Sequence, residues 1–157
     1  MKNTTLCYIE HEGCYLMLHR VKKQNDVNRD KWVAVGGKLE EDESPEDCAL
    51  REIREETGLE VTGLRYCGLI TFVSDRWEGE YMHLFHAHGP AGPLKDCDEG
   101  RLEWVPKAEI DRLPQWAGDR IFYRLMEEGG PFFSLKLRYQ GEELIQAVLN
   151  GKTMQSF

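Results

Sequence analysis

The sequence predicts a mixed α/β protein with several short strands and two helices. Stretches in which apolar and polar residues alternate, such as the one with Leu16 and Leu18, lie between glycines and polar turns, which is typical of strands. Two other segments have apolar residues three or four positions apart between capping residues, which is typical of helices. A chain of 157 residues that is 41% hydrophobic can bury its own core, so we expect residues 1–157 to form a single domain.

The first forty residues predict three strands. Residues 4–20 indicate two strands joined at Glu12 and Gly13, and residues 21–31 form a polar loop. A short strand at residues 32–35 follows the loop and stops at a pair of glycines.

A helix is predicted to begin after Ser44. Ser44 suits the N-cap, the proline after it suits the first helical position, and Asp47 completes a pattern that resembles a capping box. Ala49 and Ile53 form an apolar stripe, and Gly58 is a typical residue at which a helix ends.

The rest of the chain predicts more strands and a second helix. Strands are expected at residues 61–74, 80–88, 101–106 and 132–139. An amphipathic helix fits residues 119–128, with Asp119 as its N-cap. Residues 142–149 fit the second strand of a hairpin, although a helix is an alternative there.

Charge and cysteine content exclude several classes of protein. Of the 28 acids, ten lie at residues 40–60 with only two bases, so this segment carries the whole net charge of −8. Stable nucleic-acid binding, which uses a basic surface, is therefore not expected. No apolar run approaches the ~18 residues of a membrane helix. The five cysteines contain no CxxC pair, and no signal peptide is recognisable, so we expect reduced thiols and a cytoplasmic location.

Three acids on the first helix indicate a metal site. Glu52, Glu55 and Glu56 are three and four positions apart, which places three like charges on one helix face. Helical spacing directs Arg51 and Arg54 away from that face. Clustered carboxylates suit hard cations such as Mg²⁺ or Mn²⁺, which keep part of their shell for water and phosphate.

The glycine pair before this helix fits the same chemistry. Gly36 and Gly37 allow a sharp strand exit and a close approach of a ligand to the backbone, although an ordinary turn is the alternative. Lys38 and Arg51 are nearby cations that could neutralise phosphate oxygens.

The segment at residues 37–59 resembles the Nudix box, GX5EX7REUXEEXGU, where U is a bulky apolar residue. Every position matches: Gly37, Glu43, Arg51, Glu52, Ile53, Glu55, Glu56, Gly58 and Leu59. The resemblance implies a Nudix fold, in which a mixed β-sheet is sandwiched between α-helices. It also implies hydrolysis of a nucleoside diphosphate linked to another group.

Within this family the chain is most similar to the MutT-type 8-oxo-dGTP diphosphatases. That likeness implies Mg²⁺-dependent hydrolysis of oxidised purine nucleoside triphosphates to the monophosphate and pyrophosphate, which protects DNA, with Mn²⁺ as a possible substitute. The implied metal ligands are the carbonyl of Gly36 and the side chains of Glu52, Glu55, Glu56 and Glu99. Glu52 is then the general base, with Glu99 as the alternative. Glu43 is structural or auxiliary, and Arg51 orients carboxylates by ion pairing.

The same likeness implies the substrate contacts. Gly37, Lys38 and Lys23 would contact phosphate, while Trp116, Asp119 and Phe72 would contact the base. Two departures leave base selectivity open. Some members place two adjacent acids where this chain has Gly118 and Asp119, and some place Asn where it has Val33.

Alternatives remain at the level of substrate and role. ADP-ribose, a nucleotide sugar or an unmodified dNTP would use the same box, although the absence of proline at residues 71–74 disfavours ADP-ribose. A non-catalytic nucleotide sensor is disfavoured because the box carboxylates are present. His86 and His88 alternate on one strand, but without a third ligand a satisfied strand face is the better interpretation. The chain is expected to be a monomer or a homodimer.

Overall fold

The computed structural model describes all 157 residues. Its strands are β1 (Lys2–His11), β2 (Cys14–His19), β3 (Trp32–Ala34), β4 (Thr62–Ser74), β5 (Glu80–His88), β6 (Arg101–Pro106), β7 (Phe133–Gln140), β8 (Glu143–Leu149) and β9 (Lys152–Thr153). The helices are α1 (Pro45–Thr57), the 3₁₀ helix η1 (Lys107–Arg112) and α2 (Ala117–Glu127). The mixed α/β class predicted from the sequence is confirmed.

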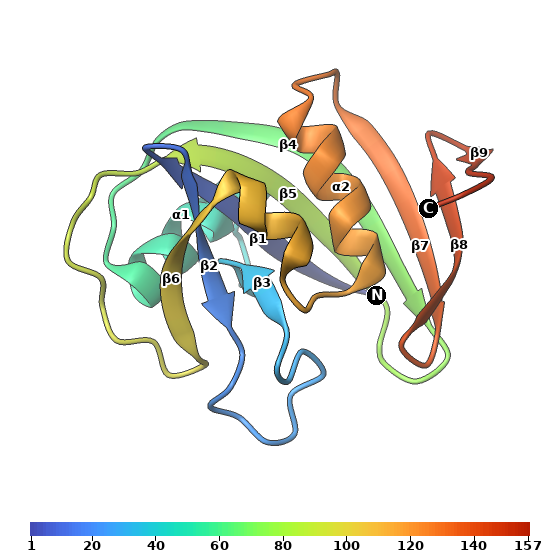
Figure 1. The fold of residues 1–157 in the computed structure, drawn as a ribbon, viewed down its shortest axis with the longest axis horizontal. Coiled ribbons are helices and arrows are strands. Elements are labelled where there is room, and N and C mark those ends of the chain that lie inside the picture. The colour runs from blue at the N-terminus through green and yellow to red at the C-terminus, as the bar shows by residue number, and fades with distance from the viewer.

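All nine strands form one mixed sheet in the order β3-β2-β1-β5-β4-β7-β8-β9, with β6 also paired to β2 (Figure 1). The β1–β5 and β4–β7 pairs are parallel and the others are antiparallel. Beyond the end of β3, the chain continues across β1 through bridges from Val35 to Cys7 and from Lys38 to Thr4. These bridges carry the glycine pair over the sheet and into the start of the carboxylate helix.

The two α-helices lie on opposite faces of the sheet. Successive side chains of a strand point to opposite faces. Tyr8 on β1 therefore packs in the core that contains Phe122 of α2, whereas its neighbour Ile9 packs in the core that contains Ile53 of α1. The sandwich implied by the sequence resemblance is thus confirmed (Figure 1).

Helix α1 begins and ends as predicted. Ser44 and Asp47 exchange both hydrogen bonds of a capping box, and a proline occupies the first turn. Gly58 closes the helix in a left-handed conformation with φ of 78°. These local contacts fix the register of the helix and hence the direction of its acids.

The predicted start of the second helix is wrong. Helix α2 begins at Ala117, with Trp116 in the N-cap position and no side-chain cap. The phenol of Tyr139 accepts a hydrogen bond from the backbone N–H of Gly118 at 2.8 Å. This long-range contact satisfies one of the free N–H groups at the helix start, so no local cap is needed. Asp119 consequently lies inside the first turn.

The hairpin alternative for residues 142–149 is the correct one. β8 pairs antiparallel with β7, and its Leu144 and Ala147 are buried in the core under α2. The 3₁₀ helix and β9 were not predicted. All five cysteines are free, four of them buried, which agrees with the expected reduced thiols. No helix has both the length and the apolar character needed to span a membrane.

Candidate active site

A pocket of about 470 Å³ brings most of the predicted site residues together. Those that line it are Gly36, Gly37, Lys38, Glu52, Glu56, Phe72, Glu99, Trp116 and Asp119. Lys23, Glu43, Arg51 and Glu55 lie outside the lining. The pocket has an acidic part, formed by Glu52, Glu56 and Glu99, and an aromatic part, formed by Phe72, Trp77, Trp116 and Tyr139.

Both glycines before α1 are needed for close packing. A Cβ atom on Gly36 would lie 1.8 Å from the backbone oxygen of Thr5, which cannot move without breaking the strand. A Cβ atom on Gly37 would lie 2.3 Å from the Cδ atom of Glu52. The Gly37 carbonyl also accepts a 2.8 Å hydrogen bond from the Thr5 N–H. The backbone therefore runs directly against the Glu52 carboxylate, which an ordinary turn would not require.

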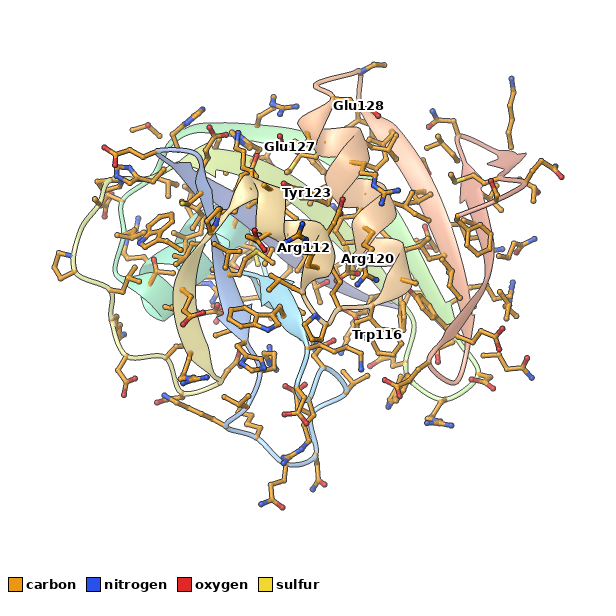
Figure 2. The ribbon with its side chains drawn as sticks, viewed as in Figure 1. Arg112, Trp116, Arg120, Tyr123, Glu127 and Glu128 are labelled. Atoms are coloured by element: carbon orange, nitrogen blue, oxygen red, sulfur yellow. The ribbon has the colours of Figure 1, made fainter.

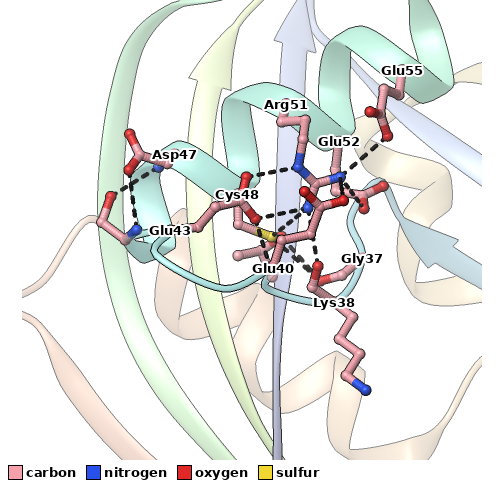
Figure 3. Close-up of polar contacts among 11 residues, drawn as sticks. Gly37, Lys38, Glu40, Glu43, Asp47, Cys48, Arg51, Glu52 and Glu55 are labelled. Carbon is pink, nitrogen blue, oxygen red and sulfur yellow. Dashed lines mark hydrogen bonds and ion pairs between the residues drawn. The ribbon is translucent and has the colours of Figure 1, made fainter.

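Arg51 lies among the carboxylates and does not point away from them as its helical position suggested. Its guanidinium donates to both oxygens of Glu43 at 2.7 and 2.9 Å, to Glu52 at 2.8 Å and to Glu55 at 3.2 Å (Figure 3). It also donates to the carbonyl of Lys38 at 3.1 Å. The long side chain can bend back, and its fork of five donors serves several acceptors at once. Arg51 thus ties the helix to the loop that precedes it.

This pairing sets the charge of Glu43. Hydrogen bonds from Arg51, together with one from the backbone N–H of Glu40, lower the pKa of Glu43 to about 2. Glu43 is therefore ionised over the whole physiological range and acts as a fixed partner for Arg51. Arg54, by contrast, pairs with Glu60 at the exposed end of the helix and does not reach the pocket.

Glu56 has an unsatisfied oxygen in the acidic part of the pocket. Its Oε2 atom is buried and has no hydrogen-bond partner. Burial, together with the neighbouring charges of Glu99 and Glu52, raises the pKa of Glu56 to about 9. A buried acceptor without a donor costs about 1–3 kcal/mol. Such an atom beside other carboxylates fits a divalent cation as its missing partner.

The acids are not yet gathered as they would be around a bound ion. No three His, Cys, Asp or Glu side chains are close enough together to form a complete metal site. Glu55 is 59% exposed and is held by Arg51, and the pocket acid Glu99 is held by Arg20 at 3.2 Å and Lys23 at 3.5 Å. The donor chemistry therefore fits a hard cation, although small movements of Glu55 and Glu99 would be needed.

The two predicted phosphate contacts from lysine differ in position. Lys38 lines the pocket, but its ammonium group points away from the carboxylates (Figure 3). Lys23 lies outside the lining and reaches the pocket only through its ion pair with Glu99. Of the two ammonium groups, only that of Lys23 contacts an acid of the pocket.

Trp116 is the centre of the aromatic part. It is only 7% exposed and contacts the rings of Tyr139, Trp77 and Phe72 edge-on at centroid distances of 4.9, 5.4 and 6.1 Å. Edge-on contacts of this kind are favourable for aromatic rings. The sequence pointed to Trp116 and Phe72, and the structure adds two further aromatic residues to the same wall.

Asp119 supplies a polar group beside this wall. Burial raises its pKa to about 7, and the charge of Glu80 acts in the same direction, while Arg120 and Lys31 oppose it. Near neutral pH the carboxyl is thus present in both its protonated and its ionised form, so it can donate or accept a hydrogen bond.

The lining residues that sequence reasoning missed include Arg20 and Asn28 from the β2–β3 loop, Trp77 and Tyr139. None belongs to a motif. Trp77 is an isolated tryptophan between two strands, and Tyr139 occupies an inward position of β7. The only sequence signal for either residue is its apolar character, which indicates burial but not a binding role. Asn28 lies in the polar loop at residues 21–31, where composition gives no direction.

A second pocket, of about 350 Å³, contains another polar cluster. Glu10 accepts hydrogen bonds from His86 at 3.0 Å and Tyr15 at 3.4 Å and pairs with Lys107 at 3.1 Å. Glu127 contacts Tyr15 and Lys107 in the same cluster. Trp116 and Glu127 mark the two ends of α2 in Figure 2, so the two pockets lie near opposite ends of this helix.

Two histidines of β5, His83 and His86, have hydrogen-bond partners within the chain, whereas His88 is exposed and contacts the ring of His86. His86 is bound to Glu10, and His83 contacts Tyr66 and the side-chain oxygen of Asn3 at 3.0 Å. Lys107 lies between the acids of the second pocket, in the space that a cation would need. These contacts agree with a satisfied strand face.

Comparison with known proteins identifies the family. A family model described as NUDIX domain matches residues 3–126. An oxidized purine nucleoside triphosphate hydrolase from Danio rerio is 34% identical over 128 residues, which cover 78% of this chain and 79% of the relative. A CTP pyrophosphohydrolase from Escherichia coli is 31% identical over 108 residues, covering 68% of this chain and 76% of that protein.

A solved structure supports the same assignment. The crystal structure of a MutT protein from Bacillus halodurans superposes with a TM-score of 0.83 at 27% identity, covering 96% of this chain and 98% of that one. Nudix hydrolases act on small nucleotide substrates and generally use divalent metals. Because the family model spans most of the chain and the carboxylate helix is intact, we conclude that this protein belongs to the Nudix family and is a pyrophosphohydrolase.

Proposed function

We propose that this enzyme hydrolyses oxidised purine nucleoside triphosphates, such as 8-oxo-dGTP, to the monophosphate and pyrophosphate. The observation that carries the proposal is that one pocket joins the acidic part, which suits a metal-bound polyphosphate, to an aromatic part whose rings suit a base. The name of the Danio rerio relative supports the same substrate class. Removing such nucleotides from the pool would protect DNA from mutation.

A divalent cation would be held in the acidic part by the Gly36 carbonyl, Glu52, Glu55, Glu56 and Glu99. We expect Mg²⁺, with Mn²⁺ as a substitute. When bound, such an ion neutralises phosphate charge and makes water more acidic. The unpartnered Oε2 atom of Glu56 is the strongest sign that the protein leaves room for it.

The chain itself supplies the base and the positioning groups. Glu52 would accept the proton of the attacking water, because its carboxylate is held firmly against Gly37 and by Arg51. Glu43 keeps Arg51 in place through two hydrogen bonds. The backbone of Gly37 and the side chains of Lys38 and Lys23 would contact phosphate oxygens.

The aromatic part would receive the base. Trp116 and Phe72 form apolar walls, and Asp119 is the polar group within reach of a base edge. Leu137 and Tyr139 on β7 line the same pocket although they lie beyond the segment matched by the family model. We therefore propose that residues 1–157 work as one domain. Five free thiols are typical of the reducing cytoplasm, where such an enzyme would act.

A second candidate substrate is an unmodified nucleoside triphosphate such as CTP, because the Escherichia coli relative is a CTP pyrophosphohydrolase. The test is a hydrolysis panel at low, equal concentrations of 8-oxo-dGTP, dGTP, CTP and ADP-ribose with Mg²⁺ and product identification. We expect the highest kcat/KM for 8-oxo-dGTP, with pyrophosphate released. Preference for CTP or ADP-ribose would replace the proposed substrate, and absence of all turnover would favour a sensor role.

A further inference from the structure

Asn28 presents a fixed amide to the pocket. It lies in the polar loop between β2 and β3, is half-buried and lines the aromatic part. Its Oδ1 atom accepts a hydrogen bond from the indole N–H of Trp116 at 2.8 Å. An indole nitrogen can only donate, so the atom that faces Trp116 must be the amide oxygen. The amide NH₂ group is therefore turned away from Trp116.

This NH₂ group has no partner within the chain. The side chain of Asn28 makes its one hydrogen bond through the oxygen, so both N–H donors remain free. The nitrogen is not one of the buried atoms without a partner, so its two N–H groups are open to solvent or to a ligand. A donor pair at the wall of a substrate pocket is thus available to the substrate.

The loop holds Asn28 in place before any ligand arrives. Its backbone N–H donates to Asp26 at 3.0 Å, and its carbonyl accepts from the N–H of Lys31 at 2.8 Å. Asp26 is in turn held by Arg20 at 2.6 Å. A donor that is already ordered loses little entropy on binding and can discriminate well between ligands.

Asn28 and Asp119 both lie beside Trp116, and together they offer donors and an acceptor. The edge of a 6-oxopurine has the complementary pattern, with the O6 acceptor next to the N1–H donor. The Val33 side chain, which lines the same pocket, offers no hydrogen bond. We propose that the NH₂ group of Asn28 binds the exocyclic oxygen at position 6 of the base and so selects 6-oxopurine over 6-aminopurine nucleotides. This inference rests on the proposed function and adds a specificity residue to it.

The test replaces only the NH₂ group of Asn28 and keeps the oxygen that faces Trp116. In Asn28→Asp the oxygen facing Trp116 is kept, while the NH₂ group becomes a second acceptor that repels a carbonyl and attracts an amino group. The substrates are dITP and dATP, which differ at position 6 and at the adjacent N1. Asn25→Asp places the same charge at an exposed position of the same loop and is the matched control.

We expect the wild type to prefer dITP and Asn28→Asp to lower the dITP/dATP ratio of kcat/KM by about tenfold or more. Asn25→Asp should leave the ratio unchanged. An unchanged ratio in Asn28→Asp, or an equal loss for both substrates, would show that Asn28 only anchors Trp116 and would overturn the inference.

A binding measurement separates this inference from the proposed function. Calorimetry with dIMP and dAMP reports base selection without turnover, and Asn28→Asp should reverse or level the preference there as well. If the wild type hydrolyses no triphosphate, the proposed function fails, and the dIMP/dAMP comparison still decides the role of Asn28. If 8-oxo-dGTP is hydrolysed but neither ratio responds to Asn28→Asp, only the inference about Asn28 fails.

Discussion

The two pockets near the ends of α2 each contain a half-buried acid, Glu10 or Glu56, and the pKa values of these two acids are shifted in opposite directions. In the second pocket, burial alone would raise the pKa of Glu10, yet hydrogen bonds from His86 and Lys107 outweigh it and the pKa is lowered. In the active-site pocket, Glu56 has an oxygen without a partner and its pKa is raised to about 9. The comparison teaches that the paired carboxylate of Glu10 serves the fold, whereas the unpaired oxygen of Glu56 marks the place of a ligand.

The largest effect is expected on catalytic activity, which should depend on an acid of the active-site pocket and not on an acid of the second pocket. Glu52→Gln keeps the size of the side chain but removes the base, so kcat should fall by about 10²–10⁴-fold. Glu10→Gln makes the same chemical change in the second pocket and should retain turnover. Both variants are assayed for Mg²⁺-dependent hydrolysis, with circular dichroism as a check of folding. Wild-type turnover in a folded Glu52→Gln variant would contradict the role of Glu52.

Glu56→Gln should increase stability in the absence of metal. The folded-state pKa of Glu56 is raised, so the folded protein is penalised as pH rises from about 4.5 towards 9, and this penalty is absent in acid. The variant should therefore be more stable than the wild type by about 1–3 kcal/mol at pH 8, and equal to it below pH 4.5. Denaturant unfolding in the presence of a chelator measures the difference.

Added Mg²⁺ should reverse this order. The ion stabilises the wild type because it binds only the folded state, and Glu56→Gln should lose much of that gain in Tm. If Mg²⁺ raised the Tm of both proteins equally, Glu56 would not be one of its ligands.

Glu10→Gln should change the free energy of unfolding in the opposite direction from Glu56→Gln. The pKa of Glu10 is lowered in the folded state, so its stabilisation is present above the unfolded pKa near 4.5 and is lost as pH falls through the folded value. We expect the variant to be less stable by about 1 kcal/mol at pH 7 and to match the wild type in strong acid. Mg²⁺ should shift the Tm of both proteins by the same amount, since this pocket is not a metal site.

The two parts of the active-site pocket also differ in how much of them could be predicted from the sequence. Two members of the acidic part, Glu52 and Glu56, were predictable because they lie four positions apart on a helix whose caps at Ser44 and Gly58 are local. The direction of the Arg51 side chain was not predictable. Helical spacing gives the position of its Cα atom, but the long side chain bends back to Glu43 and Glu52.

The aromatic part depends on contacts between distant segments. Trp116 meets Asn28 from the loop before β3, Trp77 from the turn before β5 and Tyr139 from β7. The same tertiary contacts misled the prediction for Asp119. Tyr139 satisfies the N–H of Gly118, so the helix starts earlier and Asp119 faces the pocket instead of capping the helix.

The smallest expected effect tests whether Asp119 follows the active-site pattern or that of Glu10. Its pKa is raised to about 7 by burial, so the folded state loses stability as pH rises from about 4 to 7 and changes no further above that. Asp119→Asn should thus gain stability relative to the wild type over this interval. The gain should be about 1 kcal/mol, because the half-buried side chain keeps contact with solvent, which screens its charge. The charge of Glu80 raises the pKa of Asp119, so Glu80→Gln should move the interval to lower pH. A stability difference that instead appeared only below pH 4 would place Asp119 with the satisfied acids, and the base-binding role proposed for it would lose its electrostatic support.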